Sequence, residues 1–142
     1  MADPRNIIDF EGIGGVYATY LIDDSTITYS ATATGGSAGV NLAVTLSTHK
    51  TVALAADGEA VIGKLVKVES DNKATVQVGG YTTLPGGASA TLTVGTVAVG
   101  ALGAASAKGY IRSAASATAA ELIRTGPAIH DSGTTTAVMV KF

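Results

Sequence analysis

Apolar and polar residues alternate with a period of two in several short segments of the chain. In residues 40–46 (VNLAVTL) valine and leucine occupy every second position, and in residues 74–80 (ATVQVGG) valine does so. This period is typical of a β-strand with one buried face. Residues 91–95 (TLTVG) are also predicted as a strand, in which Gly95 shifts the apolar parity as a β-bulge would.

The last seven residues and the segment 63–80 show the same pattern. The terminal TAVMVKF predicts a strand that closes the sheet and directs Val138, Val140 and Phe142 inward. Residues 63–80 read as two strands around Asp71–Asn72, and both residue types tolerate the positive φ of a primed hairpin turn. We therefore predict a β-hairpin with its turn at Asp71–Asn72.

Signals for a helix are confined to one place. Residues 118–121 match a capping box, but Gly126 and Pro127 follow closely and limit any helix to about two turns. The glycine- and alanine-rich stretches at 31–39 and 100–109 read as surface loops. The prediction is a single compact all-β fold, a β-barrel or β-sandwich, with at most one short helix.

The first 25 residues differ in character from the rest. They combine Pro4 and several glycines with apolar residues, whereas residues 26–142 form the predicted β-rich body. The segment is too apolar for an idle tail and too rich in glycine for a helix. We leave open whether residues 1–25 are an N-terminal arm or an extra strand of the body.

Composition narrows the classes of function. Charged residues make up 14% of the 142 residues, compared with about 25% in an average domain, and the net charge is −2 without a basic cluster. Nucleic-acid binding is therefore not expected. There is no cysteine, no signal peptide and no apolar run of membrane-spanning length, so we expect a protein made in the cytoplasm that has no membrane partner.

Candidate catalytic and metal-binding residues are few. His130–Asp131–Ser132 contains the letters of a catalytic triad, but neighbours in a turn point apart, and His49 reads as a solvated loop residue. Asp57, Glu59, Glu69 and Asp71 flank turns, where we expect solvated charges. Calcium is the most conceivable metal, at Asp23–Asp24, yet the EF-hand spacing is missing. We expect no enzyme, no cofactor and no metal site.

The glycine-rich and aromatic residues suggest little chemistry. GIGG at 12–15 and TGGSAG at 34–39 lack the spacing of phosphate-binding loops and read as flexible connections. There is no Trp, and the tyrosines read as core or interface residues, which argues against a carbohydrate-binding module. Tyr17 and Tyr20 lie on opposite faces of a strand, so one of them can be exposed.

From about residue 50 onward, the order of features resembles the capsid decoration, or cement, proteins of tailed bacteriophages. The segments that carry the resemblance, over about two-thirds of the chain, are ADGEAVIGKLVKVE (56–69), ATVQVGGYTTLPGG (74–87), ATLTVG (90–95), KGYIR (108–112) and TTAVMVKF (135–142). The resemblance implies a small barrel or tulip-like module without an active site. It also implies a virion protein that binds the major capsid protein on the outer surface of the head, stabilises the shell and forms a homotrimer there.

The N-terminal segment has no counterpart in this resemblance. Because its apolar residues can gain order by pairing with the edge of a sheet in a partner or a neighbouring copy, we expect it to contribute to attachment. The capsid-binding residues expected on this basis are Ile7, Ile8, Phe10, Ile13 and Tyr17. A chain that begins near Asp24 is expected to keep its fold and to bind capsids weakly. A tail, fibre or adhesin-type β module that presents a receptor-binding face is the alternative function.

Overall fold

Strands dominate the structure, a computed structural model that describes residues 13–115, 119–122, 126–131 and 138–142. Of the described residues, 45% are in strands and 8% are helical, which confirms the predicted all-β fold with one short α-helix in the described part of the chain. The elements are β1 (Val16–Ile22), β2 (Ala43–Thr48), β3 (Thr51–Leu54), β4 (Gly63–Val68), β5 (Lys73–Gly79), β6 (Tyr81–Leu84), β7 (Ala98–Ala101), β8 (Tyr110–Ser113), α1 (Ala119–Leu122), β9 (Ala128–Asp131) and β10 (Val138–Lys141), with single 3-10 turns at Thr34–Gly36 and Ala104–Ser106.

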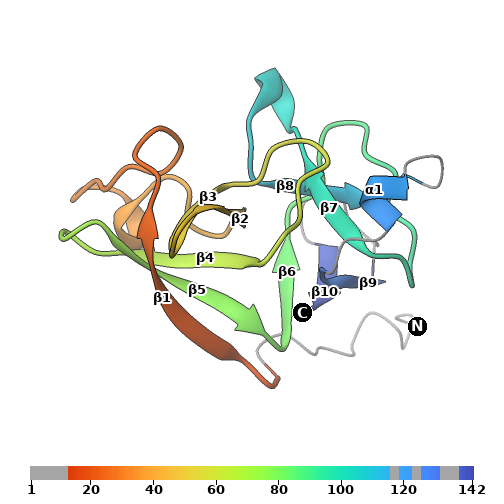
Figure 1. Ribbon diagram of the computed structural model, residues 1–142, viewed down its shortest axis with the longest axis horizontal. Coiled ribbons are helices and arrows are strands. Elements are labelled where there is room, and N and C mark those ends of the chain that lie inside the picture. The colour runs from red at the N-terminus through yellow and green to blue at the C-terminus, as the bar shows by residue number, and fades with distance from the viewer. Residues whose placement is uncertain (1–12, 116–118, 123–125, 132–137) are drawn as a thin grey trace, which may run out of the picture.

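The first five strands form a closed barrel in the order β1-β3-β2-β4-β5. β1 pairs antiparallel with β5 from Val16 to Leu21, whereas it pairs with β3 in parallel only at Leu21 and Ile22. Figure 1 shows β1 continuing beside β5 past the end of the β2–β3 hairpin. On the side of β1 that faces β3, strand pairing therefore closes the barrel only at the C-terminal end of β1.

The second half of the chain packs against the barrel as two smaller sheets. β10 lies between β6 and β9 in a three-stranded sheet, and β7 pairs with β8. A bridge between Ala60 and Val99 links the β3–β4 connection to β7. The terminal strand forms as predicted, with Val138 and Val140 fully buried and Phe142 packed against the same core, but it lies in the centre of its sheet.

Two apolar clusters make up the core. The barrel cluster consists of Ile22, Ile27, Val44, Val52, Leu65, Val68, Ala74 and Val76. The second cluster consists of Ala43, Ala55, Val61, Leu84, Ala98, Ile111, Ile129, Val138 and Val140. Since Ala43, Ala55 and Val61 come from the barrel half of the chain, the two halves share apolar packing and form one body.

The N-terminal segment contributes one strand to the barrel. Residues 16–22 form β1, a barrel strand, so for this part the extra-strand alternative holds, and residues 1–12 lie outside the described residues. The place of β1 in the barrel argues against the expectation that a chain starting near Asp24 keeps its fold, and that expectation stays untested. Such a chain would lack the strand that joins β5 to β3.

The other strand predictions have mixed outcomes. Val76 is buried in β5, as predicted. In the segment 40–46 the strand begins only at Ala43, and Leu46 is exposed. The prediction of a strand at 91–95 is wrong: these residues form a loop and turn, and Gly95 adopts a φ of +87° there rather than in a bulge.

The β4–β5 hairpin is present, but its turn differs from the prediction. The Glu69 N–H donates to the Lys73 carbonyl at 2.8 Å, and the Asn72 N–H donates to the Glu69 carbonyl at 3.0 Å. These bonds define a three-residue loop in which Asn72 alone has positive φ (61°). A third loop residue in the left-handed region is typical of a hairpin with a bulge, not of a two-residue primed turn.

The glycine-rich stretches at 12–15 and 34–39 were predicted to be flexible connections. Their described residues instead make close contacts with other elements. A Cβ on Gly80 would lie 2.5 Å from the Ile13 carbonyl oxygen, which accepts a hydrogen bond from the Tyr81 N–H at 2.9 Å. A Cβ on Gly36, at φ +88°, would lie 1.9 Å from the Val68 carbonyl oxygen. Ile13 of the first stretch is therefore packed directly against the backbone of Gly80, and Gly36 of the second stretch against that of Val68.

Candidate interaction surface

The two histidines occupy separate exposed positions. His49 lies in the turn between β2 and β3, and His130 lies on β9 with its ring perpendicular to that of Tyr81, at a centroid distance of 5.3 Å. Ser132 and Gly133 lie outside the described residues. Among the residues that the structure describes, no group of three or more His, Asp or Glu side chains could hold a metal ion.

The acidic residues considered as candidate sites bind neighbouring groups of the protein. Glu59 accepts the Ala56 N–H at 2.9 Å, and Asp23 accepts both the hydroxyl and the N–H of Ser25. These hydrogen bonds lower the pKa of Asp23 below its ordinary value. Glu69 and Asp71 form exposed ion pairs with nearby lysines. The carboxylates therefore support turns and strand ends.

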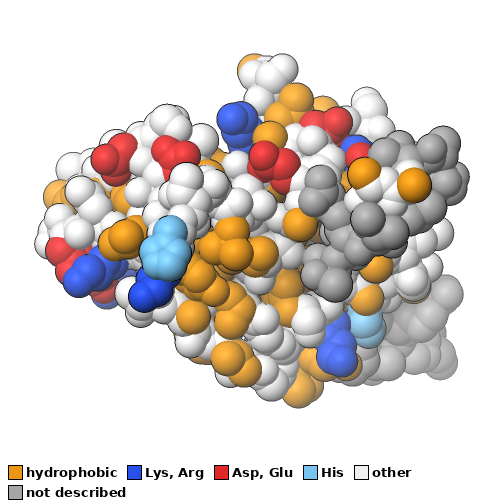
Figure 2. Space-filling model, viewed as in Figure 1, with side chains coloured by type: hydrophobic (Ala, Val, Ile, Leu, Met, Phe, Trp, Pro, Cys, Tyr) orange, Lys and Arg blue, Asp and Glu red, His pale blue; other side chains and the backbone are white. Residues whose placement is uncertain are grey.

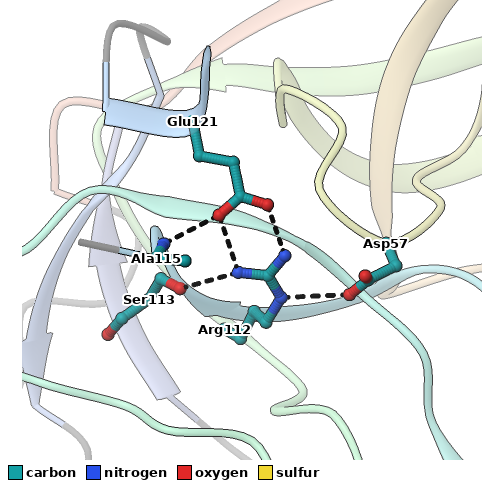
Figure 3. A network of polar contacts seen from close by, with 5 residues as sticks. All are labelled: Asp57, Arg112, Ser113, Ala115 and Glu121. Carbon is teal, nitrogen blue, oxygen red and sulfur yellow. Dashed lines mark hydrogen bonds and ion pairs between the residues drawn. The ribbon is translucent and has the colours of Figure 1, made fainter. Parts of the chain in front are cut away.

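One polar network is largely buried, and the sequence analysis did not find it (Figure 3). Arg112 on β8 donates from Nη1 and Nη2 to the two carboxylate oxygens of Glu121 on α1, at 3.0 and 2.5 Å. Its Nε donates to Asp57 at 3.0 Å and its Nη1 to the Ser113 carbonyl at 3.1 Å, while Glu121 also accepts the Ala115 N–H at 2.7 Å. The bonds to Glu121 and Asp57 raise the pKa of Arg112 further above its ordinary value.

This network borders a shallow groove. The groove has a volume of about 670 Å³ and is lined mainly by Ala, Ser and Thr of residues 88–96 and 113–115. The Arg112 guanidinium donates to two carboxylates and a carbonyl. Its bond to Glu121 holds α1 on β8, and its bond to Asp57 holds the β3–β4 connection there. The network therefore has a structural role.

The most distinctive surface feature is the exposed apolar side of β1. Ile13, Val16, Tyr17 and Leu21, here called the β1 patch, are each about half exposed, at 55, 56, 55 and 48%. In Figure 2, hydrophobic side chains gather on the face of the molecule over β1 and beside the β2–β3 hairpin. Most large apolar side chains are buried on folding, so a concentration of exposed ones indicates a binding surface.

Strand alternation explains why β1 exposes Tyr17 and Leu21; Val16 lies before a shift in the β1–β5 register. Ala18 and Tyr20 pair with Val76 and Ala74 of β5, which are buried in the barrel, and therefore face inward. Tyr17, Thr19 and Leu21 take the opposite face. The sequence prediction that only one of Tyr17 and Tyr20 faces solvent is confirmed, since Tyr20 packs against the barrel core.

The backbone of β1 also has a free edge. The Leu21 N–H donates to the Lys50 carbonyl at 2.8 Å, so alternate residues of β1 direct their N–H and C=O groups toward β3. Tyr17 and Thr19 share this direction, but β3 begins at Thr51, the partner of Leu21. Within the described parts of the chain, β1 has no strand partner on this side before Leu21.

The expected capsid-binding residues divide into two groups. Ile13 and Tyr17 lie in the β1 patch, while Ile7, Ile8 and Phe10 lie outside the described residues. The sequence analysis did not list Val16, Leu21 or Leu46 as binding residues, although the alternation of residues 16–22 could have indicated Leu21 beside Tyr17. That any of these residues binds a capsid stays a prediction.

Comparisons of the chain with protein-family models, with curated proteins and with solved structures gave no match. The resemblance to capsid decoration proteins therefore stays a prediction. In the described part of the chain, no helix has the length and hydropathy needed to cross a bilayer.

Proposed function

We propose that this protein is a capsid decoration protein that binds the outer surface of a tailed-phage head through the β1 patch and stabilises the shell. The observation that carries the proposal is the half-exposed apolar patch Ile13, Val16, Tyr17 and Leu21 on a strand whose backbone is fixed by the barrel. A preformed apolar surface can bind a protein shell without ordering a loop.

The geometry also favours a binding role over catalysis. The carboxylates that could form a catalytic pair hold turns or Arg112, and the groove beside Arg112 is lined mainly by small hydroxyl and methyl groups. An active site in an apolar pocket normally brings together several polar groups that are free to act on a substrate. What the fold exposes instead is the β1 patch, a group of large apolar side chains.

The size of the patch bears on how the protein would bind. Full burial of a large apolar side chain contributes about 1.5–3 kcal/mol, so the exposed halves of these four contribute roughly 3–6 kcal/mol. Association itself costs on the order of 4–15 kcal/mol. One copy would therefore bind weakly, and clustering into the expected homotrimer on the major capsid protein would strengthen attachment through avidity.

The test is co-sedimentation with expanded capsids of the phage that encodes the chain. Tyr17→Asp and Leu21→Asp should each reduce the bound fraction at least tenfold, since each buries a charge on the patch. Val94→Asp is the matched control, because Val94 is 58% exposed but lies on the turn before β7. The control variant should bind like the wild type.

Two further measurements decide between this function and its alternative. Densitometry of purified particles should give stoichiometric copy number, and a particle map should show clusters of three copies on the head. A handful of copies, or isolated single copies, would contradict the proposal. A map that places the chain on the tail would favour the tail, fibre or adhesin-type module, whose receptor face would then be the same patch.

A further inference from the structure

The free edge of β1 is short and bounded at both ends. At its C-terminal end, the Leu21 N–H already donates to the Lys50 carbonyl, and Leu21 pairs with Thr51 of β3. At its N-terminal end, the preceding chain turns to the β5 side of β1, where the Ile13 carbonyl accepts the first N–H of β6. The edge therefore has no described strand partner only along residues 16–20, at the rim of the molecule (Figure 1).

Two residues in this stretch offer backbone groups to another strand. Tyr17 and Thr19 direct their N–H and C=O groups to the free side, whereas Ala18 directs its own to β5. Residues 17–20 (YATY) contain no charged residue and no proline, which natural sheets commonly place on an exposed edge to prevent pairing. This edge is therefore suited to pair with a further strand.

We propose that two copies of the chain associate through this edge, with β1 antiparallel to β1 about a two-fold axis at Ala18. Tyr17 of each copy then lies opposite Thr19 of the other, and the two residue pairs exchange four backbone hydrogen bonds. Such a contact is isologous, so it ends with a dimer in which both edges are paired. The side chain at the axis is only a methyl group, which lets the strands approach.

The obstacles at the two ends fix the register. A shift toward β3 would place Tyr17 opposite Leu21, whose N–H is already bonded to Lys50. The opposite shift would place Thr19 opposite Gly15, which lies before the strand begins. A shift by one residue would set outward groups against groups that point away. Only the pairing of Tyr17 with Thr19 uses both free residues of both copies.

Pairing at the edge leaves the outer face of β1 uncovered and brings the two β1 patches together. Each Tyr17 then lies diagonal to Leu21 of the second copy, a separation that an aromatic ring can span. The dimer thus carries one continuous apolar surface made from two patches. The inference goes beyond the proposed function and does not rest on it, because the two-fold contact forms in solution without a capsid.

The small extent of the contact predicts a weak dimer. Two five-residue strands bury less surface than the roughly 1,200–2,000 Å² of a stable interface. The dimer should therefore dissociate on dilution, and sedimentation equilibrium of the full chain should show a reversible monomer–dimer exchange. A chain that stays monomeric at a concentration on the order of 1 mM, where even weak specific contacts form, would overturn the inference.

Cysteine cross-linking tests the register, since the chain has no cysteine of its own. Ala18→Cys places two thiols at the axis, in a pair whose Cα atoms lie about 4.5 Å apart, within disulfide range. Oxidation should therefore give a covalent dimer. In Thr19→Cys the two Cα atoms lie about 8 Å apart, two positions along the strand, which is too far for a disulfide. Val94→Cys, at an exposed turn, gives the background level.

Two outcomes of the cross-linking contradict the inference. If Ala18→Cys forms no more dimer than Val94→Cys, the edges do not pair. If Thr19→Cys forms as much dimer as Ala18→Cys, the register is wrong, because that result requires the two Thr19 residues to lie opposite each other.

A proline on the edge provides a second readout. Thr19→Pro removes an N–H that points to the free side, so the hydrogen bonds between β1 and β5 are kept, and proline is tolerated on edge strands. It should weaken dimerisation at least tenfold, whereas Thr19→Ala, which keeps the N–H, should dimerise like the wild type. A folded Thr19→Pro chain that dimerises normally would refute the pairing. If this variant does not fold, the Ala18→Cys result decides.

Discussion

The ion pair between Arg112 and Glu121 gives a sharp test of how the C-terminal half is held together. Arg112→Met would remove both bonds between Arg112 and the carboxylate of Glu121, a residue that is only 8% exposed. We expect this change to weaken the packing of α1 on β8. The same change also removes the bond to Asp57, whose side chain is 58% exposed.

The magnitude follows from burial. Removing one partner of a buried ion pair costs about 3–5 kcal/mol, because the remaining charge is left uncompensated. Loss of an exposed pair costs about 0–1 kcal/mol, so Asp57→Asn should have a small effect. Replacing both partners, as in Arg112→Met with Glu121→Leu, removes the buried charge together with its partner and should cost less than Arg112→Met alone.

Urea denaturation followed by circular dichroism measures these differences as changes in the free energy of unfolding. In a thermal melt, Arg112→Met should lower the melting temperature by about 10 °C, since a loss of 1 kcal/mol in the free energy of unfolding corresponds to about 3 °C for a chain of this size. The double variant should recover at least half of that loss. If Arg112→Met and Asp57→Asn destabilise the protein equally, by under about 1 kcal/mol, the buried pair does not hold α1 as described.

Three further predictions address the barrel and its turns. A chain that begins at Asp24 lacks β1 and should show no cooperative thermal melt, whereas a chain that begins at Ile13 should melt like the full chain; equal melts would mean that β1 is dispensable. Asn72→Gly should be tolerated and Asn72→Val should cost about 1 kcal/mol or more, because Asn72 has positive φ; equal stability in urea would contradict this. Gly95→Ala should cost only about 1–2 kcal/mol of backbone strain, since a Cβ there meets nothing within 4 Å, whereas Gly36→Ala should cost clearly more because its Cβ would meet a backbone oxygen at 1.9 Å; a larger loss at Gly95 would refute the packing argument.

The local pattern predicted those elements whose environment is the same along their whole length. Val76 in β5 and Val138 and Val140 in β10 lie in strands paired on both sides, so a two-residue period corresponds to burial. The segment 91–95 has the same period, but the turn that positions Thr96 and Ile129 for hydrogen bonding occupies it. Pattern alone does not distinguish a paired strand from an extended loop.

Alternation, turn residues and residue types are local properties, and they were enough to predict the all-β class, the short helix and the terminal strand. The three-dimensional fold was needed to learn that residues 16–22 belong to the barrel, that Arg112 meets Glu121 and Asp57, and that β1 has no described strand partner before Leu21 on the side of β3. These features depend on which distant segments become neighbours, and strand pairing, burial and charge partners are fixed only when the chain has closed on itself.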